Sequence, residues 1–515
     1  MTSSSNSVLR PSHMRTDNHQ PGGDIPMSQP ALAVSMNPLG VRDPKFDGPQ
    51  GDAIPFFHEG RYHLFYLEAP TAKYDQPDRG RTPWRHIVSD NLVEWHDLGI
   101  ALPLGEGDDP DIDGIWTGSI IAVDGVLHVF YTGGRRTASI PQTICHATST
   151  DGVLFKKSPS NPIHFPRSEW FEQRDWRDPF VFWNDEHKQY WMLITARAGE
   201  GPPGRRGVIA LSTSDDLVTW TTVREPFYAP GNTYSMECPE VFRLGGKWRL
   251  VFSRFTEYAA TVYREAEDLA GPWRTPKHPA LDGAYWYAAK SLEDVQGRRI
   301  AFGWVHDRRG FAEGGEWLWG GDMCLPREIF VGEDDRLCVR MPHEVDGQLT
   351  SQRTLLIRQA SGGATAEWEA SALGAFSVAE IEIGALRCSL TRLTVEADLQ
   401  DLAGGVGLAL YANTGLTEGL LLFFDASTGV ISLGAPTGGQ ESDRLPAPFV
   451  TNQIKGRSRG KLRVDLYLRG NVLEMFVDGQ VALTYRQYFD RPFTAQAYVE
   501  DGVVTFRATL ATRET

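Results

Sequence analysis

The chain has 515 residues, more than one ordinary hydrophobic core accommodates, so two or more domains are expected. Its formal net charge of −15 at pH 7 comes without a basic stripe, which argues against nucleic acid and anionic membranes as partners and does not hinder a neutral ligand. Five widely scattered cysteines without a C-x-x-C pair argue against a disulfide framework and a zinc site, and no metal or other cofactor is predicted.

Residues 1–40 are rich in Ser, Pro, Gly and Asn and contain no apolar segment of the kind that a secretory signal needs. They are predicted to form a disordered lead. No apolar run in the chain is long enough to span a bilayer, so no membrane association is expected. A cytoplasmic location is the expectation, secretion by another route stays open, and no feature of the sequence indicates the oligomeric state.

A repeat of short apolar strands occupies the chain from residue 41 to about 340. Five dense strands recur at spacings of 51 to 65 residues, namely YHLFYL (62–67), LHVFYTG (127–133), YWMLITA (190–196), WRLVFS (248–253) and RIAFGWV (299–305). Each follows a shorter strand, and four of them are followed by a polar turn and an aromatic residue. Such units predict an all-β fold, a β-propeller of five blades, with a single β-sandwich as the alternative.

The pattern of apolar and polar residues changes after the repeat. From about residue 350 to 515 the chain alternates apolar and polar residues over short runs such as LTVEADLQ (393–400), with no helical period. This pattern is typical of antiparallel strands, so a separate β-sandwich domain is predicted, with the boundary inside 341–354.

Three acidic residues fall at corresponding places in the first, third and fourth units. Asp52 precedes IPFF, Asp178 precedes PFVF and Glu237 comes just before PEVF. Because the first strand of each blade lines the central channel, these carboxylates are expected to meet at its mouth. Glycoside hydrolysis uses carboxylates that attack, donate a proton and stabilise positive charge on the sugar ring. Taken singly, each acid has an alternative interpretation as a turn or edge-strand residue.

Five tryptophans of the repeat region are candidate sugar platforms. They are Trp84, Trp116, Trp286, Trp317 and Trp319. Trp116, and Trp286 beside Tyr287, are preferred as substrate contacts because they lie outside the dense strands. The alternative for each is packing in the core.

Polar neighbours of the acids complete the candidate site. Arg177 precedes Asp178 and is able to bind a sugar hydroxyl or lower the pKa of a carboxylate. Cys238 follows Glu237, and Ser119 shares the segment GIWTGSII (114–121) with Trp116. All three are predicted to contribute to substrate binding.

At these residues the chain resembles glycoside hydrolase family 32, the invertase, inulinase and levanase family. The resemblance rests on WRDPFVF (176–182), MECPEVF (236–242), GIWTGSII (114–121), DGAYWYAAKSL (282–292), RIAFGWV (299–305), MCLPREI (323–329) and LRVDLYLRGNVLEMFVDG (462–479). It covers residues 41–515 and implies a propeller followed by a sandwich. It also implies a retaining attack on β-fructosides such as levan or inulin, with Asp52 as nucleophile through a covalent fructosyl-aspartate, Glu237 as general acid and base, and Asp178 as transition-state stabiliser.

The first motif departs from the family pattern, which usually reads Trp-Met-Asn-Asp-Pro-Asn-Gly. Here the stretch is DGPQGDAIPFFHEG, with Gly51 before Asp52 and no Pro-Asn-Gly after it, and Asp43 and Asp47 are alternative nucleophiles. This departure is similar to divergent members such as levan fructotransferases, which transfer the fructosyl unit to an internal hydroxyl and form a difructose anhydride.

Three alternatives to fructoside hydrolysis therefore remain. They are this intramolecular transfer, an inverting glycosidase of the arabinosidase and xylosidase type, and a carbohydrate-binding propeller without catalysis. Linkage preference (β-2,1 or β-2,6) and endo or exo attack also stay open at this point.

Overall fold

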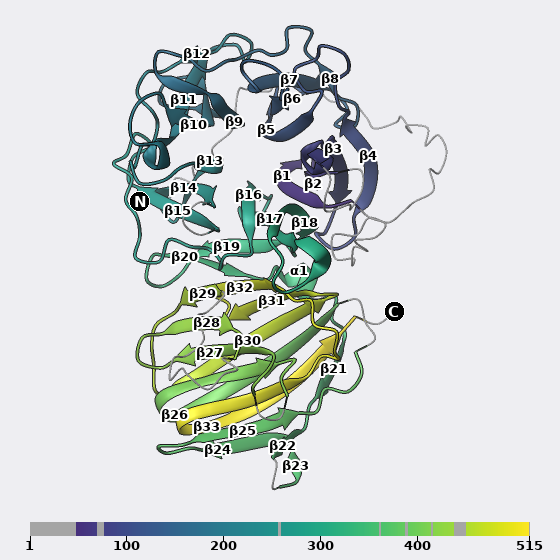
Figure 1. Ribbon diagram of the computed structural model, residues 1–515, viewed down its shortest axis with the longest axis vertical. Coiled ribbons are helices and arrows are strands. Elements are labelled where there is room, and N and C mark those ends of the chain that lie inside the picture. Colours follow the sequence, from purple (N-terminus) through teal and green to yellow (C-terminus); the bar gives the residue numbers. More distant parts are fainter. Residues whose placement is uncertain are drawn as a thin grey trace, which may run out of the picture.

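The computed structural model describes residues 48–69, 77–255, 259–359, 362–386, 390–413, 416–436 and 450–513. The predicted lead, Asp43 and Asp47 lie outside these ranges. The chain forms a five-bladed β-propeller followed by a β-sandwich, which confirms the predicted fold class (Figure 1). Among the described residues, no helix is long and apolar enough to cross a membrane.

The first three blades are four-stranded antiparallel sheets that follow one another along the chain. Blade one contains β1 (Gln50–His58), β2 (Arg61–Glu68), β3 (Trp84–Ser89) and β4 (His96–Leu102). Blade two contains β5 (Gly114–Val123), β6 (Val126–Gly134), β7 (Gln142–Ser149) and β8 (Lys156–Lys157). Blade three contains β9 (Phe171–Asn184), β10 (Gln189–Ala198), β11 (Gly207–Ser214) and β12 (Thr221–Thr222).

The last two blades are less regular, and the ring closes between blades five and one. Blade four contains β13 (Glu237–Leu244), β14 (Lys247–Arg254) and β15 (Ala260–Ala266). Blade five contains β16 (Tyr287–Glu293), β17 (Arg299–Arg308), β18 (Trp317–Met323), β19 (Arg327–Val331) and β20 (Leu337–Arg340). Short 3-10 helices are η1 (Pro77–Gly80), η2 (Pro203–Arg205) and η3 (Arg309–Phe311). The pairing of Gln50 in β1 with Gly321 in β18 joins the fifth blade to the first.

A side-chain turn explains the polar segment that recurs after the third strand of the blades. In blade three, Asp216 Oδ1 accepts the backbone N–H groups of Val218 and Thr219 at 2.8 and 2.7 Å. Asp151 and Asn91 make the same pair of bonds in blades two and one. A short polar side chain that binds the backbone in this way turns the chain without a regular ladder. The repeat in the sequence is thus a repeat of turn chemistry.

The sandwich follows a single helical turn, α1 (His343–Asp346). Its strands are β21 (Ser351–Thr354), β22 (Ile357–Gln359), β23 (Ala364–Thr365), β24 (Glu367–Ser371), β25 (Phe376–Ile381), β26 (Thr391–Leu410), β27 (Leu420–Asp425), β28 (Val430–Gly434), β29 (Val450–Gln453), β30 (Gly460–Arg469), β31 (Val472–Val477), β32 (Val481–Arg486) and β33 (Ala495–Thr512). The longest strands, β26 and β33, pair along their length with shifts of register near their middle (Figure 1).

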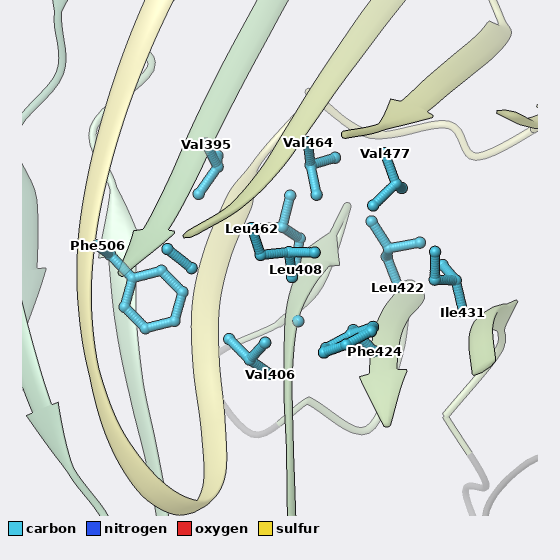
Figure 2. Close-up of a pocket in the computed structure, with 12 residues that line it drawn as sticks. Val395, Val406, Leu408, Leu422, Phe424, Ile431, Leu462, Val464, Val477 and Phe506 are labelled. Carbon is cyan, nitrogen blue, oxygen red and sulfur yellow. The ribbon is translucent and has the colours of Figure 1, made fainter. Parts of the chain in front are cut away.

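The sandwich core contains a small cavity between its strands (Figure 2). Its volume is about 20 Å³, and every residue that lines it is apolar, including Val406, Leu408, Phe424 and Phe506. A space of this size has room for about one water molecule, but a water needs polar partners to stay there. The cavity is therefore a gap in packing and not a carbohydrate site.

Buried ion pairs fix the two domains to each other. Arg327 of β19 is fully buried and pairs with Asp282 of the propeller and with Glu474 of β31. Arg486 of β32 pairs in the same way with Asp322 of β18. Removing one member of such a pair would leave an unpaired buried charge, so the pairs favour one orientation of the domains.

Candidate active site

The first strands of the five blades meet around the axis of the propeller. Strands β1, β5, β9, β13 and β16 pack against one another in that cyclic order, and β16 packs against β1. Side chains at equivalent positions of these strands are therefore brought close together. This is the arrangement that the repeat in the sequence predicts.

Each of these five strands is interrupted by a β-bulge at the same position. The residues at the bulges, here called the bulge ring, are Asp52, Thr117, Asp178, Cys238 and Ala288. The residues just before them, here called the pre-bulge ring, are Gly51, Trp116, Arg177, Glu237 and Tyr287. A bulge bends a strand and re-aims its side chain. Asp52, Asp178 and Cys238 have φ angles of 30°, 57° and 53°, a region that non-glycine residues occupy at a cost and that is frequent at functional sites.

Asp52 is partly buried and is held by a donor on each oxygen. The Trp304 indole Nε1 donates to Oδ1 at 2.9 Å, and the Thr117 hydroxyl donates to Oδ2 at 2.5 Å. Burial raises the pKa of Asp52 to about 7, and the charges of Asp178 and Glu237 add to the increase, while the two donors oppose it. The carboxylate is thus oriented and able to change protonation state near neutral pH.

Asp178 is nearly inaccessible, with 3% of its surface exposed. Its Oδ2 accepts the backbone N–H of Cys238 at 3.0 Å and the Thr195 hydroxyl at 3.1 Å. Its own backbone N–H donates to the Thr132 hydroxyl at 2.8 Å. Within the described residues both hydrogen bonds to the side chain go to Oδ2, and Arg177 Nε also lies 3.7 Å from this oxygen, so Oδ1 has no hydrogen bond there.

Glu237 has a different, charged environment, and 22% of its side chain is exposed. Arg177 Nη2 donates to Oε1 at 2.9 Å, and the Tyr287 hydroxyl donates to Oε2. Burial raises the pKa of Glu237, the charge of Arg177 opposes this increase, and the charge of Asp178 adds to it. Burial and the neighbouring Glu237 raise the pKa of Tyr287 well above its ordinary value, so the phenol keeps its proton and remains a donor.

The register inferred from the sequence is wrong for one of the three acids. Asp52 and Asp178 are bulge residues, but the fourth blade has Cys238 at the bulge and Glu237 one position earlier. The two acidic positions are easily confused in the sequence because both precede a proline-containing strand segment. The difference of one residue puts Glu237 beside Arg177 and Tyr287 of the pre-bulge ring.

Two of the predicted substrate contacts are wrong. Trp286 is fully buried, with the Arg327 guanidinium 4.3 Å from its ring centroid, so it has no surface for a sugar. Ser119 is 4% exposed, and its hydroxyl accepts the backbone N–H of Val181 at 2.9 Å, which joins blades two and three. Both residues stabilise the propeller or its contact with the sandwich.

The other predicted contacts lie at the acids. Arg177 and Tyr287 bind Glu237 directly. Cys238 is 2% exposed, and it orients Asp178 through its backbone and approaches Thr117 Oγ1 with its thiol at 3.8 Å. Trp116 is partly buried, and its indole N–H donates to the carbonyl of Gly80 at 2.9 Å, so only its ring is left for a ligand.

Sequence reasoning missed Thr117, Trp304 and Lys290. Thr117 is the bulge residue of blade two, so counting from Asp52 along the repeat would have found it. Trp304 stands in a dense strand, where its burial was expected but its bond to Asp52 was not. Lys290 is 3% exposed, and its Nζ donates to the carbonyl of Gly118 at 3.0 Å, close to the charges of Asp52 and Asp178. Burial lowers the pKa of Lys290.

The sequence matches a known family over both domains. The N-terminal domain of glycosyl hydrolases family 32 matches residues 48–342, and the C-terminal domain of the same family matches residues 363–512. The chain belongs to glycosyl hydrolases family 32. The resemblance carried by WRDPFVF and MECPEVF is thereby confirmed.

Curated relatives of this family 32 chain are named as invertases, sucrose-6-phosphate hydrolases and fructan 1-exohydrolases. Raffinose invertase of Escherichia coli is 31% identical over 316 residues, which are 56% of this chain and 61% of the relative. Sucrose-6-phosphate hydrolase of Zymomonas mobilis is 27% identical over 444 residues, 82% of this chain and 80% of the relative. The chain thus spans less than two thirds of the raffinose invertase.

Solved structures of the family share the whole two-domain fold. Fructan 1-exohydrolase IIa from Cichorium intybus has a TM-score of 0.71 at 17% identity, covering 92% of this chain and 98% of that one. A family 32 β-fructofuranosidase from Bombyx mori has a TM-score of 0.67 at 20% identity, with 93% and 94% covered. At these identities the likeness is one of fold.

Proposed function

We propose that this family 32 chain is a β-fructosidase that acts on fructans or fructo-oligosaccharides with retention, through a covalent bond between the fructosyl unit and Asp52. The observation that carries the proposal is the pair of accessible carboxylates, Asp52 and Glu237, in different environments beside the buried Asp178. Two carboxylates with separate tasks are the requirement of a retaining glycosidase. The relatives, which include invertases and fructan 1-exohydrolases, support a β-fructoside as the substrate.

In the first step Asp52 attacks the anomeric carbon of the fructosyl unit. A carboxylate oxygen forms a bond to this carbon while the bond to the leaving oxygen breaks, and Glu237 gives its proton to that oxygen. Thr117 and Trp304 support this role because they bind both oxygens of Asp52 and so fix the plane of the carboxylate. In the second step Glu237 takes a proton from water, the water oxygen bonds to the same carbon, and Asp52 is released.

The change in role of Glu237 follows from the charge of its neighbours. While Asp52 is ionised, its negative charge raises the cost of ionising Glu237, which favours the protonated acid. Once Asp52 is bound to the fructosyl unit it is neutral, so this repulsion ends. Arg177, at 2.9 Å, then stabilises the ionised form that acts as a base.

Asp178 fits the role of transition-state stabiliser. Its Oδ2 is already occupied by two donors, whereas Oδ1 has none among the described residues. The free oxygen suits two neighbouring hydroxyls of the fructosyl ring. A fixed negative charge beside the ring also favours the positive charge that develops at the anomeric carbon.

Trapping and product analysis test the mechanism. During turnover of inulin, rapid acid quench and peptide mass spectrometry are expected to find a fructosyl adduct on Asp52. With methanol as acceptor, retention gives methyl β-fructofuranoside, whereas an α-product would refute retention. An adduct on another carboxylate would refute the assignment of Asp52.

The acceptor in the second step is tested by the products from levan, inulin and sucrose. Free fructose is the expected product. A cyclic difructose anhydride among the products would mean that the fructosyl unit is transferred to an internal hydroxyl and not to water. No turnover of any β-fructoside would favour a propeller that only binds carbohydrate.

A further inference from the structure

Two tryptophans of β18 lie at the edge of the candidate active site. Trp317 packs against the ring of His306 and Trp319 against the ring of Trp304, and these two contacted rings are 4.4 Å apart, while Leu318 is 9% exposed. Trp319 is partly buried and touches the position where Gly51 would carry a side chain. Trp317 is 40% exposed. A single exposed aromatic residue needs no functional explanation. A functional role for Trp317 therefore depends on whether its ring is connected to the catalytic acids.

A series of ring contacts connects Trp317 to the partners of both reacting carboxylates. The His306 ring lies 4.7 Å from Trp317, stacked at 29°, and 4.4 Å from Trp304, which donates to Asp52. The Tyr287 ring, whose hydroxyl donates to Glu237, lies 5.3 Å from the same imidazole. Trp317 is thus one aromatic layer away from the partners of Asp52 and Glu237.

The sandwich domain holds the loop that precedes Trp317. Glu313 accepts the Tyr485 hydroxyl at 2.6 Å and the backbone N–H of Tyr488 at 2.7 Å. The Tyr285 ring lies 5.0 Å from Trp317 and 4.9 Å from Tyr485. A ring held in this way loses little conformational freedom when a ligand stacks on it.

We propose that Trp317 is the platform for the second sugar ring of the substrate, the ring that departs with the leaving oxygen, and that Glu313 positions this platform. The inference rests on the proposed fructosidase function. The leaving oxygen receives its proton from Glu237, so the departing sugar lies on the side of Glu237 and Tyr287. The flat apolar face of a hexose matches an exposed indole, and the stacked His306 fixes the plane of that indole.

The test compares a substrate that has a second sugar ring with one that lacks it. For Trp317→Ala, kcat/KM on 1-kestose is expected to fall by about 5- to 10-fold, mainly through KM, because one aromatic stacking contact is lost. On methyl β-fructofuranoside, kcat/KM is expected to stay within about two-fold, because no ring reaches Trp317. Trp317→Phe keeps a flat ring and is expected to restore much of the loss.

The positioning role of Glu313 is tested separately with the same two substrates. Glu313→Ala is expected to show the same split between 1-kestose and methyl β-fructofuranoside, with a smaller effect. Phe376→Ala is the matched control, because Phe376 is a 50% exposed aromatic residue of the sandwich. It is expected to change neither substrate.

The outcomes separate this inference from the function on which it rests. If the wild-type chain cleaves neither substrate, the fructosidase function is refuted. If it cleaves both and Trp317→Ala loses both equally, or neither, the sugar platform is refuted. An equal loss on both substrates for Glu313→Ala would refute the positioning role.

Discussion

The Thr117 hydroxyl gives the sharpest test of how the site controls Asp52. Thr117→Val removes the donor to Asp52 Oδ2 and keeps the shape of the side chain. The hydrogen bond favours the ionised carboxylate, so its loss raises the pKa of Asp52 further above its ordinary value. Because Asp52 must be ionised to attack, activity is lost as pH falls through this pKa, and the acidic limb of the pH profile is expected to move to higher pH.

The expected size follows from the geometry. Thr117 is fully buried, and its oxygen lies 2.5 Å from Asp52 Oδ2. A hydrogen bond to a charged group contributes about 1.5–3 kcal/mol, and one pKa unit corresponds to about 1.4 kcal/mol, so the pKa is expected to rise by about 1–2 units. The starting value is about 7. At pH values below the acidic limb, kcat/KM of Thr117→Val is therefore expected to be about 10- to 100-fold lower than that of wild type, with little change on the alkaline plateau.

The assay is kcat/KM for sucrose or 1-kestose across the pH range, compared with wild type. Thr394→Val is the matched control, because Thr394 is buried in the sandwich and donates to Asp465 Oδ1 at 2.6 Å. It removes an equivalent bond without touching the site and is expected to leave the pH profile unchanged. A uniform loss at every pH for Thr117→Val, with the limb in place, would refute the reasoning.

Three further predictions concern the charges around the acids. Asp52→Asn is expected to raise the melting temperature near pH 8 and not near pH 4. The neutral form of Asp52 stabilises the fold fully below its ordinary pKa of 3.8, and this contribution is lost as pH rises through about 7, whereas Asn stays neutral at both pH values. Calorimetry at pH 4 and pH 8 measures this difference, and an equal effect at both contradicts the prediction. Lys290→Met removes a buried positive charge near Asp52 and is expected to move the acidic limb of kcat/KM to higher pH, whereas an unmoved limb means that the charge does not act on Asp52. Tyr287→Phe removes a donor to ionised Glu237, so the pKa of Glu237 rises and the basic limb is expected to move to higher pH; movement in the opposite sense excludes that role.

The repeat made most of the fold predictable. Each blade carries its own dense strand, and blades one to three also share the bonds of Asn91, Asp151 and Asp216 to the backbone, so the number of blades is readable from local signals. The convergence of Asp52 and Asp178 followed from the same repeat, because equivalent positions of the first strands share the axis.

The errors arise where side chains depend on contacts far apart in the sequence. Trp286 lies outside a dense strand, which suggested exposure, but Arg327 of a later strand covers it next to the sandwich. Trp304 lies inside a dense strand, which suggested core packing alone, yet its indole N–H reaches Asp52 across 252 residues of sequence. Neither contact has a signal in the local pattern.

The one-residue offset of Glu237 has a physical consequence for the three acids. The hydrogen bonds to Asp52 and Asp178 come from uncharged donors, namely hydroxyl groups, a backbone N–H and an indole, and the Arg177 guanidinium lies farther from Asp178, at 3.7 Å. A third carboxylate in the same ring would share those surroundings and repel both others at close range. In the pre-bulge ring Glu237 instead accepts hydrogen bonds directly from Arg177 and Tyr287, a cation and a phenol that keeps its proton. Different surroundings give carboxylates different protonation behaviour. The five-fold repeat therefore supplies unlike acids by using two adjacent positions in the first strands of its blades.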